Sequence, residues 1–113
     1  MSPGPDNQSK VSPVKLESFT KIPKVIGAGL VTSDGFVIES QFTVGYDAEK
    51  TGAMAARIVT RIKESLAIEK ASAILYTENN VFFVKETASG TLFVICQRSA
   101  NIGLVKIYID KIT

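Results

Sequence analysis

Histidine is absent from the 113-residue sequence, and there is a single cysteine, Cys96. Without histidine the chain lacks the commonest general base and the commonest metal ligand of proteins. One cysteine excludes an internal disulfide, which favours a reducing compartment such as the cytoplasm. Because no histidine is present to activate it, Cys96, in the apolar run 92–96, is predicted to be a buried hydrophobic side chain rather than a nucleophile.

Long apolar runs and an excess of charge are also missing. No apolar stretch approaches the roughly 18 residues that span a bilayer, and the N-terminal segment lacks the apolar centre of a signal peptide. The 13 basic and 11 acidic residues give a net charge of only +2, which is too weak to indicate nucleic-acid or membrane binding. We therefore expect a soluble, cytoplasmic protein with no nucleic-acid partner and no membrane insertion.

Motifs for metal or nucleotide binding are equally hard to find. Asp34 and Asp47 each suit a local role, in a turn and at a helix cap respectively, and no cluster of oxygen ligands has calcium spacing. Residues 27–29 read Gly-Ala-Gly, but the spacing fits neither phosphate-loop nor dinucleotide patterns. Close packing of the strand against a helix is the preferred explanation of these glycines. We expect no cofactor, no metal and no enzymatic activity.

The length of the chain suits one domain. Residues 1–11 are polar and rich in proline and glycine, which predicts a disordered tail followed by a single domain over residues 12–113. Ser12 and Pro13 can begin a helix, and Pro23 must end it, so this helix has only about two turns.

Turn signals divide much of the remaining sequence into β-branched and aromatic runs. The expected strands cover residues 25–32, 36–41, 71–77, 81–86 and 91–97. Residues 81–84 and 92–95 are apolar at consecutive positions, whereas a sheet with one wet face should alternate. Both faces of the sheet are therefore expected to be covered.

The clearest helix is predicted over residues 47–66, with Asp47 as its N-cap. An apolar stripe repeats every four residues and should face the core; it comprises Met54, Ile58, Ile62 and Leu66, and Ala55 and Val59 widen it. Four charged residues fall on the other side, namely Lys50, Arg57, Arg61 and Glu64, and three of them are basic. Residues 99–113 are ambiguous, since Ile107 to Ile109 favour a strand by propensity, whereas the spacing of Leu104 and Ile107 fits a short helix, which we prefer.

Three motifs together resemble the Roadblock family of dynein light-chain and GTPase-regulator domains, over about residues 16–112. The first is Gly27-Ala28-Gly29-Leu30-Val31 with Asp34-Gly35-Phe36-Val37-Ile38. The second is Asp47-Ala48-Glu49 with Ala53-Met54-Ala55-Ala56. The third is Asn101-Ile102-Gly103-Leu104-Val105-Lys106, which is similar to the stretch where the family's third helix begins.

The resemblance implies an α+β fold: a five-stranded antiparallel sheet with the long helix on one face and short terminal helices on the other, a profilin-like layering. It also implies a homodimer in which third strands pair and long helices lie side by side. The small residues of the long helix would let a second backbone approach. The expected dimer residues are Gly52, Ala55, Ala56, Val59, Ala73, Leu75 and Tyr76.

The function implied by the resemblance is binding of a Ras-like small GTPase, as a regulator or scaffold. Lys50, Arg57 and Arg61 are then candidate contacts to an acidic patch on the partner, the alternative being an ordinary solvated face. An arginine finger from Arg57, Arg61 or Arg98 is conceivable, although scaffolding is preferred. The alternative function is a structural adaptor in a larger complex, with no nucleotide-dependent partner; a small-molecule sensor is disfavoured because no polar pocket is evident.

Overall fold

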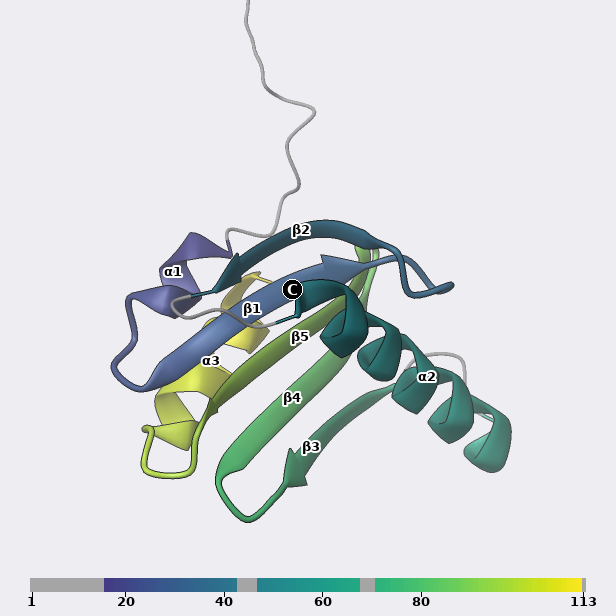
Figure 1. Ribbon diagram of the computed structural model, residues 1–113. Helices are drawn as coiled ribbons and strands as arrows, with labels where there is room; N and C mark the ends of the chain where they lie inside the picture. The colour runs from purple at the N-terminus through teal and green to yellow at the C-terminus, as the bar shows by residue number, and fades with distance from the viewer. Residues whose placement is uncertain (1–15, 43–46, 68–70, 113) are drawn as a thin grey trace, which may run out of the picture.

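The computed structural model describes residues 16–42, 47–67 and 71–112, with the side chain of Ile112 excepted. Figure 1 shows one sheet with helices on both faces. The elements in chain order are α1 (Glu17–Thr20), β1 (Val25–Val31), β2 (Val37–Phe42), α2 (Ala48–Leu66), β3 (Ser72–Tyr76), β4 (Asn80–Thr87), β5 (Gly90–Gln97) and α3 (Ile102–Ile112). The predicted tail over residues 1–11 and the predicted helix start at Ser12 lie outside the described residues.

The sheet has the strand order β2-β1-β5-β4-β3, and all of its pairs are antiparallel. Three hairpins supply three of the pairs, and the fourth joins β1 to β5 in the middle of the sheet. The sheet therefore has β2 at one edge and β3 at the other. The predicted fold class and the five strands are confirmed, with boundaries shifted by a residue or so at several ends.

The two faces of the sheet carry separate apolar clusters, which explains the consecutive apolar residues of β4 and β5. Phe82 and Phe93 belong to the cluster beneath α2. Phe83 and Val94 point the other way, into a cluster with the residues of α1 and α3. Successive residues of a strand face opposite sides of the sheet, so a strand that is covered on both sides must be apolar at every position.

The long helix begins as expected. The Asp47 carboxylate accepts a hydrogen bond from the Lys50 backbone N–H at 3.0 Å, which satisfies one of the free donors of the first turn. Ala67 follows the helix in a left-handed conformation, with φ of 54°.

The face of α2 that meets the sheet contains Ala55 and Val59 of the predicted stripe but differs from the rest of it. Its buried residues are Gly52, Ala55, Ala56 and Val59, whereas Met54 and Leu66 are 44% and 64% exposed. The reason is geometric: an α-helix turns about 100° per residue, so each step of four residues advances about 40° around the axis. The row from Met54 to Leu66 therefore winds about one third of the way around the helix and cannot remain on one face.

Glycines in the first strand allow close packing, as the sequence predicts, but against aromatic rings rather than a helix. A side chain at Gly29 would overlap the ring of Phe93, the residue opposite it on β5, and one at Gly27 would overlap Phe42. The phenylalanine rings thus cover the bare backbone of β1.

The C-terminal segment is helical, which confirms the preferred prediction. The Asn101 side chain accepts a hydrogen bond from the Leu104 backbone N–H at 3.0 Å, as an N-cap does. Val105 and Ile109, one turn apart, are buried against the sheet. Capping and burial at helical spacing outweigh the strand propensity of this segment.

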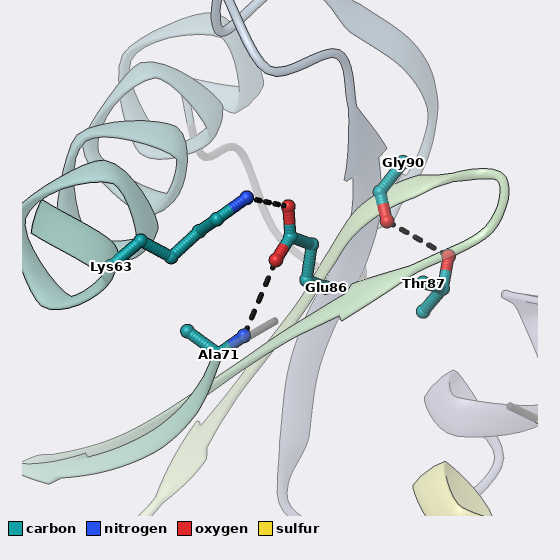
Figure 2. A network of polar contacts seen from close by, with 5 residues as sticks. All are labelled: Lys63, Ala71, Glu86, Thr87 and Gly90. Atoms are coloured by element: carbon teal, nitrogen blue, oxygen red, sulfur yellow. Dashed lines mark hydrogen bonds and ion pairs between the residues drawn. The ribbon is translucent and has the colours of Figure 1, made fainter. Parts of the chain in front are cut away.

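A polar junction ties the end of α2 to the start of β3. Figure 2 shows the Glu86 carboxylate between the two: it accepts from Lys63 Nζ at 2.8 Å and from the Ala71 backbone N–H at 3.2 Å. Glu86 lies on β4, so one carboxylate connects the helix to the edge of the sheet. No helix within the described residues combines the length and apolar character needed to cross a membrane.

Candidate protein-interaction surfaces

The edge strand β3 carries an unusual amount of exposed apolar surface. Ile74, Leu75 and Tyr76 are 40%, 39% and 59% exposed, and in the described sheet β3 has a neighbour only on its β4 side. Register places Leu75 opposite Phe82, on the α2 side, and Ile74 opposite Phe83, on the other side. Ala73 is half-buried. An apolar edge of this kind invites pairing with another strand.

The helix residues expected at the dimer interface are in a different place. Gly52, Ala55, Ala56 and Val59 are buried against the sheet of their own chain. A side chain at Gly52 would come within 2.5 Å of Val31. The small residues thus bring α2 close to its own sheet. Ile58 and Ile62, at the margin of the helix, are half-buried.

The outer face of α2 carries the three basic residues singled out in the sequence, all exposed. Lys50, Met54, Arg57 and Arg61 follow the spacing i, i+4, i+7 and i+11, which returns to one line along a helix. Met54 therefore lies among the basic residues instead of opposite them. Lys50, Met54 and Arg57 line a shallow hollow of about 420 Å³.

The charges of this face are available to a partner. The ion pairs within residues 16–42, 47–67 and 71–112 join Lys63 to Glu86 and Lys85 to Asp110. Neither Arg57 nor Arg61 is paired with a described carboxylate. We call the surface formed by Lys50, Met54, Arg57 and Arg61 the basic face of α2.

Arg98 is the third candidate for an arginine finger, and its contacts differ from those of Arg57 and Arg61. Its guanidinium lies 5.5 Å from the centroid of the Tyr76 ring, and it donates a hydrogen bond to the Thr77 carbonyl oxygen at 3.1 Å. These contacts join Arg98 to the end of β3, so the structure separates it from Arg57 and Arg61, which lie on α2.

Groups with catalytic potential are not gathered into a site in the described structure. Cys96 is fully buried, and burial raises the pKa of its thiol from 9.0 to about 11, which keeps it protonated and unreactive at neutral pH. Asp34 lies in the β1–β2 turn and Asp47 caps α2, as predicted. Residues 16–42, 47–67 and 71–112 contain no group of three metal-ligating side chains.

The described residues form a layered α+β domain with an apolar strand edge and a basic helix face. The model of the Roadblock/LC7 domain family matches residues 14–97, so the chain belongs to the Roadblock/LC7 domain family. A search of curated proteins gave no significant match.

Solved structures with the same fold support this assignment. A Roadblock/LC7 domain from Streptomyces avermitilis superposes with a TM-score of 0.76 at 14% identity, covering 86% of this chain and 87% of that one. The gliding protein MglB from Thermus thermophilus gives a TM-score of 0.76 at 16% identity, covering 90% and 86%. MglB from Myxococcus xanthus gives 0.72 at 19% identity, covering 84% and 82%. At these identities the likeness concerns the fold.

Two features of these surfaces escaped the sequence interpretation. The position of Met54 on the basic face could have been read from the one-turn spacing between Lys50, Met54 and Arg57. The exposure of Ile74 could not have been read from the sequence, because it depends on where α1 and α3 lie over the sheet. No local sequence pattern encodes that placement.

Proposed function

We propose that this protein is a homodimeric, non-enzymatic interaction module that binds a Ras-like small GTPase, as a regulator or scaffold. The proposal rests on one observation: the same domain has an exposed apolar edge strand, β3, and a long helix, α2, whose outer face is basic. Membership of the Roadblock/LC7 family supports an interaction role, and MglB, a protein of gliding, is among the structural neighbours.

Dimerisation is proposed through β3. Leu75, which is partly exposed beside Phe82, lies on the same face of the sheet as α2. Pairing two β3 strands would satisfy their free backbone groups and cover Leu75 from both copies. The expected contacts are therefore Ala73, Leu75 and Tyr76 from the set predicted above, with the exposed margin of α2 in place of its buried small residues.

The GTPase is proposed to dock on the basic face of α2. A partner with acidic side chains would contact Lys50, Arg57 and Arg61, while Met54 supplies an adaptable apolar contact between them. Binding one nucleotide state better than the other would shift the GTPase toward that state by the difference in binding free energy. The face lies opposite the sheet, so docking would leave the fold unchanged.

The test uses the Ras-like GTPases of the same genome, each loaded with GTPγS or GDP and passed over the immobilised protein. We expect at least one to bind with a preference for one nucleotide. Arg57→Glu with Arg61→Glu should slow its association about tenfold or more at low salt and leave the melting temperature and dimer unchanged. Lys21→Glu with Lys111→Glu, an equal charge change near α1 and on α3, is the control and should bind normally.

Three outcomes would overturn parts of the proposal. Binding that ignores the nucleotide would favour the structural adaptor, since no population of the GTPase would then be selected. Unchanged association by the α2 double variant would show that its basic face is only solvated. Absence of any GTPase binding would remove the GTPase part altogether.

A further inference from the structure

A groove of about 310 Å³ lies on the sheet face opposite α2, between α3 and the β3–β4 margin. Ile74 and Phe83 of the sheet and Ile109 of α3 supply its apolar lining. Lys85, Lys106 and Asp110 supply its polar rim. None of these residues belongs to the basic face of α2, so the groove is a separate surface.

The groove exists because the helices of this face do not reach the sheet edge. The cluster with α1 and α3 buries Phe83 to 3% exposure, but Ile74, its neighbour on β3, remains 40% exposed. Tyr76 lies on the same side of β3 as Ile74, because it is two residues further along the strand. In Figure 1, α1 and α3 lie behind the part of the sheet near β1 and β5, with β3 at the opposite margin.

The charges around the groove favour an acidic partner. Asp110 pairs with Lys85 at 3.4 Å, and its side chain is 60% exposed, so this contact is weak and exchangeable. Lys106, one turn before Asp110 on α3, is exposed and has no ion pair with a described carboxylate. Arg98 lies against the Tyr76 ring at the far end of the same strip. Among the described residues, Lys85, Lys106 and Arg98 place positive charges along this margin, and Asp110 is the carboxylate that lines the groove.

The dimensions suit a helix. Neighbouring strands are about 4.8 Å apart, so β3 and β4, which both line the groove, together offer a strip about 10 Å wide, close to the width of an α-helix. A helix placed there would continue the layer that α1 and α3 begin. Its apolar side chains would cover Ile74 and Tyr76, which are the exposed apolar residues of the strip.

We propose that this groove binds an amphipathic helix of a partner protein, with apolar residues on Ile74 and Tyr76 and carboxylates on Lys106 and Lys85. The inference goes beyond the proposed GTPase binding, because it concerns the opposite face of the sheet. A protein with both surfaces occupied would join two different partners, which is what a scaffold requires.

The test is a selection of phage-displayed peptides, each about four helical turns long, against the full-length protein. We expect enriched peptides with leucine-like residues at helical spacing and with glutamate or aspartate beside them. Lys106→Glu should weaken the binding of these peptides about tenfold or more, while Lys111→Glu, the same change on α3 outside the groove, should not. Ile74→Thr should weaken the binding of these peptides to a similar extent. Its control is Ile107→Thr, a change at an exposed α3 residue outside the groove.

Three results of the selection would overturn the proposal. They are failure to enrich any peptide, enrichment of basic peptides, and enriched peptides that bind the Lys106→Glu protein as well as they bind wild type. A change in the oligomeric state of Lys106→Glu by sedimentation would assign the groove to a contact between copies instead. Peptides that lose binding to Arg57→Glu with Arg61→Glu would map to α2, so failure here is distinguishable from failure of the proposed function.

Discussion

At the scale of single residues, Gly52 shows how a small side chain decides the position of a whole helix. Alanine is favoured over glycine inside a helix by about 1 kcal/mol. A methyl group at Gly52, however, would lie 2.5 Å from Cγ1 of Val31, which is fully buried and cannot move aside. The clash should exceed the gain in propensity, because overpacking a core costs about 1–3 kcal/mol.

We therefore predict that Gly52→Ala lowers the free energy of unfolding by up to about 2 kcal/mol, net of propensity, in urea titrations at one protein concentration. Gly103→Ala is the matched control, since its new methyl group would meet only Asn101 at an ordinary 3.6 Å. That variant should be as stable as wild type or slightly more stable. A Gly52→Ala protein that matches or exceeds wild type would refute the close approach of α2 to the sheet.

Cys96 links stability to alkaline pH. Burial raises its pKa from 9.0 to about 11, so the folded protein holds the thiol proton more tightly than the unfolded chain. The resulting stabilisation is complete below about pH 9 and is lost as the pH rises from about 9 through about 11. We predict a steeper fall in unfolding free energy over that range for wild type than for Cys96→Ala; parallel curves for the two proteins would contradict it.

At the scale of elements, Glu86 fixes the position of α2 relative to β3. The contacts with Lys63 and Ala71 are short, and the Glu86 side chain is only 21% exposed. Glu86→Ala leaves the Ala71 N–H and the lysine without their acceptor, which should cost about 1–2 kcal/mol of stability. Chemical denaturation measures this directly.

The second ion pair provides the comparison. Lys85 and Asp110 are 3.4 Å apart, with a largely exposed carboxylate, so Asp110→Ala should change stability by less than about 0.5 kcal/mol. Equal losses for Glu86→Ala and Asp110→Ala would show that the Glu86 junction has no special structural role.

The elements also show what the sequence could and could not predict. Turn residues and caps act over a few positions, so the strands and the start of α2 at Asp47 follow from local chemistry. The side of α2 that is buried depends on the approach distance to the sheet, which favours Gly52 and Ala55 over larger residues such as Met54. The spacing of large apolar residues takes no account of that distance. The small residues expected at a dimer interface are buried against the sheet of their own chain.

At the scale of the whole molecule, the two faces of the sheet present different candidate binding surfaces. One face carries α2 and its basic outer surface, and the other carries the groove beside α3. The edge strand β3 belongs to both, through Leu75 on one side and Ile74 on the other. Pairing at β3 would therefore place two copies of each surface in a single particle.

Sedimentation velocity at micromolar concentration measures whether the protein forms the proposed homodimer through β3. We predict a dimer for wild type, and dissociation for Leu75→Lys, because each copy would then have to bury a lysine charge beside the paired strands. Circular dichroism distinguishes a folded monomeric variant from an unfolded one. A wild-type protein that sediments as a stable monomer, or a Leu75→Lys variant that remains a folded dimer of the same affinity, would contradict the account.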